Sequence, residues 1–156
     1  MKRKLLSFAA AAVCALATGA QAQISDGIVK IGVLNDMSGL YSDIGGPGSL
    51  TAAKMAVEDY LKATKSTLKV EVVGADHQNK PDVGSNIARQ WYDTEKVDAI
   101  VDVPTSSVAL AINQVTKDKG KIMLNTGAAT ADLTGKACSP NTIHWLYDTW
   151  MLANGT

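Results

Sequence analysis

The sequence predicts an α/β fold, a three-layer sandwich in which helices cover both faces of a parallel sheet. The first observation is that apolar, β-branched segments alternate with segments of helical periodicity from residue 28 onward. The second is that the apolar segments run into polar loops before each helix begins. Repeated strand and helix steps of this kind are typical of parallel sheets, because each helix carries the chain back to the edge where the previous strand began.

The individual elements follow from local patterns. Strands are expected at 28–34, 68–73, 99–101, 122–124 and 143–146. Helices are expected to begin at Ser49, Pro81, Ser106 and Thr149. In the second helix, Val83, Ile87 and Trp91 recur at four-residue spacing, which places Trp91 in the core. Gly120 follows the third helix, where a C-cap is expected.

The first 22 residues have the pattern of a signal peptide. A basic start at residues 2–4 precedes the apolar run 5–17, and Ala20-Gln21-Ala22 supplies the small residues before a cleavage site. The run is shorter than the roughly 20 residues that span a bilayer, which disfavours an uncleaved anchor. Lipidation at Cys14 is a weaker alternative, because Val13 precedes it. We therefore expect residues 1–22 to be removed and the mature chain to be exported to the periplasm.

The composition of the mature chain excludes some classes of function. Removal of Lys2, Arg3 and Lys4 leaves 12 basic and 15 acidic residues, a net charge of −3. A nucleic-acid partner would favour a basic face, so no such partner is expected. Cys138 remains as the one cysteine after Cys14 is removed with the signal peptide. It is interpreted either as a half of a disulfide whose partner lies elsewhere or as a plain unpaired thiol.

Enzymatic and cofactor sites are not predicted. The glycine-rich loop 45–48 is neither a P-loop nor a dinucleotide fingerprint, and Pro47 removes an amide that a phosphate would use. His77 lacks a second ligand at metal spacing, because the other histidine is His144, so we place His77 in a solvated turn. The G-x-S-x-G elbow of hydrolases is missing around the three serines considered, Ser38, Ser85 and Ser106.

A ligand site is placed by topology before any residue is chosen. In parallel sheets ligands bind beside the carboxyl ends of the strands, near the point where the strand order reverses. The loops expected at that edge are 35–47, 76–80, 102–107 and 125–134. They are the segments richest in Gly, Ser, Thr, Asn and Asp.

Three motifs in this order resemble a known family. They are VKIGVL at 29–34 followed by DMSG at 36–39, AKMAVED at 53–59, and NTGAAT at 125–130 followed by DLT at 132–134. The sequence from 28 to 156 resembles the first lobe of the type I periplasmic binding proteins, within them the branched-chain amino acid (leucine) binding family and its aromatic-acid-binding and amide-binding relatives. The resemblance implies that residues 23–156 form an N-terminal lobe and that the second lobe is absent from this sequence.

The resemblance also implies a function. It predicts the substrate-binding component of an ABC uptake transporter, which captures a branched-chain amino acid, an amide or an aromatic acid and delivers it to a membrane permease. It implies no cofactor, no metal and no enzymatic activity. The alternative is a ligand-sensing module of a signalling receptor, since the same bilobed fold serves there.

The site residues are carried over from the same resemblance. The carboxylate of the solute is expected at a helix start and a following loop, on the hydroxyl and amides of Ser106 and Ser107 and on the amides of Ala128, Ala129 and Thr130. A helix N-terminus suits an anion physically. The simpler interpretation is that Ser106 is an N-cap and that 127–130 is a turn. Tyr41 and Tyr147 are expected to line the cleft, and Asp148 is expected to cap the last helix.

Overall fold

A computed structural model describes residues 26–155 of the chain. The strands are β1 (Ile28–Asn35), β2 (Lys69–Asp76), β3 (Ala99–Asp102), β4 (Ile122–Asn125) and β5 (Thr142–His144). The helices are α1 (Gly46–Thr64), α2 (Pro81–Asp93), α3 (Ser106–Lys119) and α4 (Thr149–Asn154), with a 3-10 turn, η2 (Ala131–Leu133). The predicted signal peptide, residues 1–22, lies outside the described residues.

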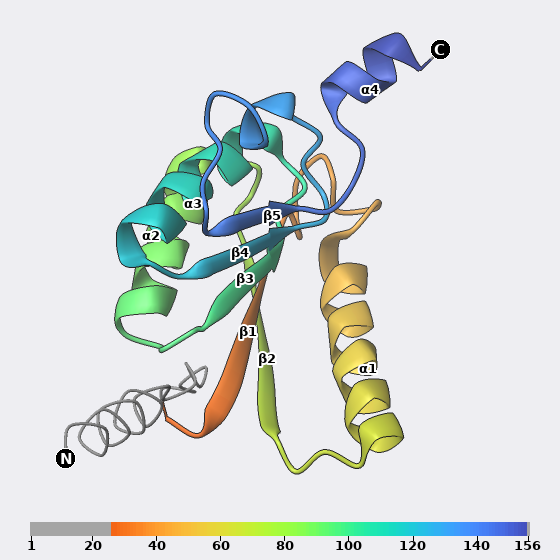
Figure 1. Cartoon of the computed structure of the whole chain (residues 1–156), viewed down its shortest axis with the longest axis vertical. Helices are drawn as coiled ribbons and strands as arrows, with labels where there is room; N and C mark the ends of the chain where they lie inside the picture. Colours follow the sequence, from red (N-terminus) through yellow and green to blue (C-terminus); the bar gives the residue numbers. More distant parts are fainter. Residues whose placement is uncertain (1–25, 156) are drawn as a thin grey trace, which may run out of the picture.

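The five strands form one parallel sheet in the order β2-β1-β3-β4-β5. The chain runs from β1 outward to β2 and then returns to β3 on the other side of β1, so the order reverses between β1 and β3. Figure 1 shows α2 and α3 on one face of the sheet and α1 on the other. The predicted α/β fold with a parallel sheet between layers of helix is therefore confirmed.

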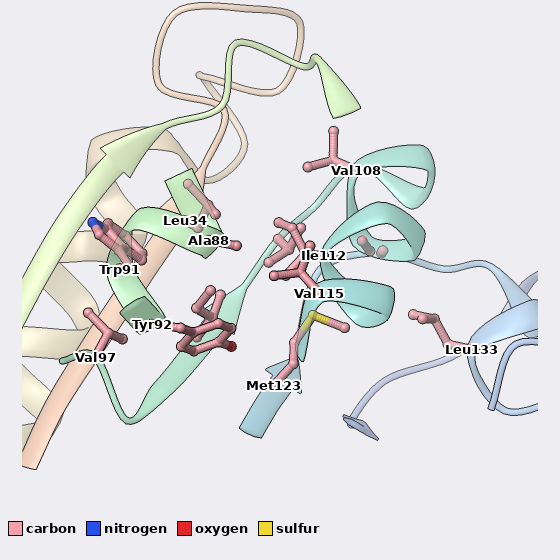
Figure 2. Close-up of a cluster of buried hydrophobic side chains, with 14 residues drawn as sticks. Leu34, Ala88, Trp91, Tyr92, Val97, Val108, Ile112, Val115, Met123 and Leu133 are labelled. Carbon is pink, nitrogen blue, oxygen red and sulfur yellow. The ribbon is translucent and has the colours of Figure 1, made fainter. Parts of the chain in front are cut away.

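The main hydrophobic core lies between the sheet and the α2 and α3 pair (Figure 2). As predicted, Trp91 is buried, with 4% of its surface exposed, and Val108, Ile112 and Val115 of α3 face the same core. Gly32 of β1 leaves room for the indole, because a Cβ there would lie 2.3 Å from Trp91 Cζ3. The sequence therefore fixes a close approach of α2 to the middle of the sheet.

The element boundaries differ from the expectations at several points. Helix α1 begins at Gly46 rather than Ser49, because Pro47 is tolerated in the first helical turn. Strand β2 extends to Asp76, and β5 spans 142–144 rather than 143–146. Gly120 is the predicted C-cap of α3, with a φ of 61°. Within residues 26–155 no helix is both long enough and apolar enough to cross a membrane.

Candidate functional site

Polar side chains at or directly after the ends of β1, β2 and β4 are buried at one edge of the sheet. Asn35 of β1, Asn125 of β4 and His77, which follows β2, have no exposed surface. Asp36, next to Asn35, is equally buried. Because buried polar groups need hydrogen-bond partners, these side chains impose a fixed arrangement on the loops that leave the carboxyl edge.

Asn35 joins the first loop to the third strand. Its Nδ2 donates to Oδ2 of Asp102. Its Oδ1 accepts from the backbone N–H of Asp36 at 2.6 Å and of Gly46 at 3.2 Å. One amide side chain therefore fixes the start of α1 against the end of β3.

Asp36 shapes the rest of the first loop. Its carboxylate accepts from the backbone N–H of Gly39 at 2.8 Å and of Tyr41 at 3.0 Å. A Cβ on Gly39 would lie 2.6 Å from the Asp36 carboxylate, so any larger residue there would displace that carboxylate. The loop thereby holds Tyr41 at the edge of the sheet.

Asp76, at the end of β2, supports the same loop. Its carboxylate accepts from Ser38 Oγ at 2.6 Å and from the backbone N–H of Met37 at 2.9 Å and of Gln78 at 2.7 Å. Burial acts to raise the pKa of Asp76, but these hydrogen bonds to the charged form outweigh burial and lower the pKa below its ordinary value. The first two loops are therefore joined through a carboxylate that is held in its charged form.

His77 does not lie in a solvated turn, and that expectation is wrong. The imidazole has no exposed surface, its Nδ1 accepts from the backbone N–H of Asn79 at 3.0 Å, and its Nε2 has no partner among the described residues. Burial lowers the pKa of His77 below 6.5, although the nearby carboxylates of Asp36, Asp76 and Asp102 act in the opposite direction. The sequence suggested exposure because polar residues surround His77, whereas the fold places it under the start of α2, beside Gly84.

The loop between β3 and α3 has an unusual backbone. Asp102 and Val103 adopt positive φ values of 78° and 61°, which are costly for residues with a Cβ and especially for valine. Asn125 Nδ2 donates to the carbonyl oxygens of both residues, at 3.0 and 3.1 Å, and the Val103 side chain is fully buried. The strained conformation is therefore held from two sides, by a hydrogen-bond clamp and by the core.

The helix start that was expected to bind a carboxylate is open. The N-cap of α3 is Thr105 rather than Ser106, and no side chain caps the helix. Thr105 Oγ1 is buried without a partner among the described residues. The backbone N–H groups of Ser106 and Ser107 belong to the first turn, where an α-helix supplies no acceptor. An anion at this end would meet free donors and the positive end of the helix dipole.

The loop after β4 is only partly open to a ligand. Ala128 is fully buried, its N–H donates to Asn125 Oδ1 at 3.1 Å, and its carbonyl oxygen lies 2.7 Å from His144 Nε2. Thr130 Oγ1 accepts from the N–H of Asp132 at 3.3 Å and caps η2. Within residues 26–155 the N–H groups of Ala129 and Thr130 have no hydrogen-bond partner, so these two, and not Ala128, are available as donors.

The loops after β3 and β4 touch each other. A Cβ on Gly127 would lie 2.6 Å from Pro104 Cα and 3.0 Å from Asp102 Oδ1. Thr126 donates from its N–H to the Asp102 carbonyl oxygen at 3.3 Å and from its hydroxyl to Asp102 Oδ1 at 3.2 Å. The open helix start and the open part of the second loop therefore lie beside each other.

A cavity of about 460 Å³ opens at this edge of the sheet. Both tyrosines named from the sequence, Tyr41 and Tyr147, line it, whereas Ser106, Ser107 and Ala128 to Thr130 belong to the loops beside it. The full lining comprises Asn35, Tyr41, Ile44, Gly45, Ser49, Asp102, Pro104, Thr126, Gly127, Leu146 and Tyr147. Asn35 and Asp102 were missed as site residues, although a polar residue that ends a buried strand is a usable signal.

Other expectations concern the surroundings of the cavity. Asp148 caps α4, as predicted, by accepting from the N–H of Met151 at 2.8 Å. Cys138 is an exposed free thiol within the described part of the chain. No group of three or more potential metal ligands occurs among residues 26–155.

Comparison with known proteins gives consistent results. The family model described as "Periplasmic binding protein" matches residues 28–156. A solved periplasmic binding protein from Burkholderia mallei is 46% identical, with a TM-score of 0.77, and the match covers 83% of this chain and 34% of that protein. A comparison with curated proteins finds no match.

Two further solved structures extend this result. A branched-chain amino acid ABC transporter periplasmic ligand-binding protein from Burkholderia xenovorans is 40% identical, with a TM-score of 0.71, over 81% of this chain and 36% of that one. A branched-chain amino acid transporter substrate binding protein from Streptococcus pneumoniae, solved with isoleucine, is 21% identical, with a TM-score of 0.68, over 78% and 34%, and shows the fold alone. The chain therefore spans about a third of the length of these proteins.

Proposed function

Because the chain belongs to the periplasmic binding protein family, we propose that it is part of the substrate-binding component of an ABC uptake transporter. In this proposal the complete protein captures a small carboxylate solute in the periplasm and delivers it to a membrane permease. The candidate solutes are branched-chain amino acids, amides and aromatic acids. Two of the three related structures described above are named as transporter proteins, and no feature of the described residues favours a signalling receptor over them.

The observation that carries the proposal is the open cavity at the carboxyl edge of the sheet, beside the point where the strand order reverses. Ligands of parallel α/β folds bind at this position. The lining combines large apolar or aromatic side chains, Tyr41, Ile44, Leu146 and Tyr147, with the polar strand ends. Such a surface suits a small molecule with one apolar and one polar end.

The proposed anchor for the solute carboxylate is the start of α3. Free N–H groups of Ser106 and Ser107 and those of Ala129 and Thr130 belong to two segments that follow β3 and β4, and the two loops touch at Gly127. Hydrogen bonds from backbone amides to a charged acceptor are stronger than neutral ones, about 1.5–3 kcal/mol each. This chain forms one wall of the site, and a second lobe would close it by shifting the population toward a closed form with higher affinity for the solute.

The experiment is a thermal-shift and calorimetric titration of the complete protein with branched-chain amino acids, short amides and aromatic acids. Stabilisation by one class is expected, since a ligand that binds only the native state raises its melting temperature. A panel without any stabilising ligand, tested on well-folded protein, would contradict the proposed function.

A pair of variants at one position then tests the anchor. Ser106→Pro removes the N–H at the first helical position, which tolerates proline, and Thr105 has the extended conformation, with a ψ of 120°, that a residue before proline requires. Ser106→Ala removes the hydroxyl alone and serves as the matched control. We expect Ser106→Pro to weaken binding about tenfold or more. Equal affinity of the two variants would show that this amide is not used.

A further inference from the structure

Asp102 is the only charged side chain among the described residues that line the cavity. The lining contains one carboxylate and no lysine, arginine or histidine. A carboxylate in a partly enclosed site without a cation is electrostatically unfavourable, and it favours a cationic partner over an anionic one. The feature is unexpected in a cavity that is proposed to receive a carboxylate solute.

The backbone that carries this carboxylate is strained and is held by several contacts. Asp102 and the next residue, Val103, have left-handed backbone conformations, which cluster at functional sites in proteins. Asn125 clamps their two carbonyl oxygens, and the buried Val103 side chain anchors the turn in the core. The orientation of the Asp102 side chain is therefore set by the fold rather than by the solvent.

The Asp102 carboxylate accepts two hydrogen bonds within the protein and has acceptor positions left over. Oδ2 accepts from Asn35 Nδ2, and Oδ1 accepts from the Thr126 hydroxyl. Both donors are neutral, and a carboxylate has about four acceptor positions, so capacity remains for a donor from a ligand. Asp102 lies in the same loop that ends at the open start of α3, so an acceptor for cations and a set of donors for anions occupy neighbouring positions.

We propose that Asp102 is the specificity-determining residue of this half-site and selects solutes that carry an ammonium group as well as a carboxylate. In this arrangement the solute carboxylate meets the amides at the start of α3 and the ammonium group meets Asp102. A simple aromatic or aliphatic carboxylate would bring a second negative charge close to Asp102, and the cavity lining holds no cation to offset the two charges. The proposal rests on the proposed function, because it assigns a solute class to the same site.

Matched pairs of ligands test the proposal on the unmodified protein. Leucine is compared with 4-methylpentanoate, and phenylalanine with 3-phenylpropanoate, by calorimetric titration of the complete protein. Each pair differs in the ammonium group alone, so at least one amino acid is expected to bind about tenfold or more tightly than its partner. Equal or tighter binding of the acid that lacks the ammonium group would overturn the proposal without any variant.

The variant Asp102→Asn then assigns the preference to this residue. It keeps the size of the side chain and one acceptor oxygen, so we expect the preference for the amino acid to fall about tenfold, while the affinity for the acid without the ammonium group does not fall. Asp43→Asn is the control, because Asp43 is an exposed residue of the first loop that does not line the cavity. A purely structural role would lower the melting temperature of Asp102→Asn and leave the ratio of affinities unchanged, which would refute the proposal.

The outcomes separate the two proposals. If none of the ligands in the broader panel binds, the solute-binding function fails and the role of Asp102 fails with it. If a ligand binds but the ratio of affinities is the same in Asp102→Asn and in the unmodified protein, the solute-binding function stands and the role of Asp102 is rejected.

Discussion

Gly127 offers a test of how closely the two site loops must approach each other. In Gly127→Ala the new Cβ would lie 2.6 Å from Pro104 Cα and 2.9 Å from Pro104 N. An ordinary contact begins near 3.4 Å, so the loops must separate by about 0.8 Å. Both neighbours are backbone atoms of a loop that is clamped by Asn125, so the clash cannot be relieved by a side-chain rotation.

The magnitude follows from this geometry. Overpacking of this kind costs about 1–3 kcal/mol, and the hydrogen bonds between Thr126 and Asp102 add to the loss if they lengthen. We expect Gly127→Ala to lower the free energy of unfolding by about 2 kcal/mol and to weaken solute binding. Equilibrium unfolding in urea measures the first effect and calorimetric titration the second.

Gly48→Ala is the matched control for this prediction. A Cβ at Gly48, in the first turn of α1, meets no atom within 4 Å, so alanine there should be neutral or stabilising by up to about 1 kcal/mol. If Gly127→Ala unfolds within about 0.5 kcal/mol of the unmodified protein, the close approach of the two loops is not required and the reasoning is refuted.

Two further predictions concern the support of the site. Burial lowers the pKa of His77 below 6.5, so the unfolded chain binds the proton first, and stability should fall as the pH drops from about 6.5 toward the lower folded-state pKa. Asp76 does not contribute in this window, because its pKa lies below its ordinary value of 3.8. Urea unfolding at about pH 7 and about pH 5 should therefore show a smaller loss of unfolding free energy in His77→Gln than in the unmodified protein. An equal loss in the two proteins would contradict the assignment to His77. Trp91→Ala should cost about 3–5 kcal/mol, because the indole is buried against Gly32, and a loss under about 1 kcal/mol in urea unfolding followed by circular dichroism would contradict that packing.

The elements of the fold were predictable because their signals are local. The four-residue spacing that ends at Trp91 and the glycine after α3 each act within one or two helical turns. The boundaries are less accurate where local signals compete, as at Pro47: the glycine-rich sequence around it predicts a loop, whereas Pro47 occupies the first turn of α1. The cavity edge was also predictable, since it follows from a parallel sheet and from the place where the strand order reverses.

The details of the site were not predictable, because they depend on contacts between distant segments. Nothing near Asp102 in the sequence shows that its carbonyl oxygen bonds to Asn125 or that its carboxylate bonds to Asn35. The same is true of Ala128, whose amide belongs to the chain's own network. The burial of His77 likewise results from the packing of α2 on the sheet, and short-range composition suggests the opposite.

The satisfied and unsatisfied polar groups at the sheet edge together limit what can bind there. The N–H of Ala128 and the side-chain amide of Asn35 take part in the buried network and have no exposed surface, so neither is available to a ligand. The groups left open include the backbone donors at the start of α3 and in the loop after β4, together with the remaining acceptor positions of Asp102. Since buried polar groups need partners when a cleft closes, a fitting solute supplies acceptors for the free donors, and a charged donor on the solute would use the remaining acceptor positions of Asp102. A solute that supplies acceptors alone would leave Asp102 with its two neutral donors only and would place a second negative charge beside it on closure, and this cost is what should separate an amino acid from a simple carboxylate at this site.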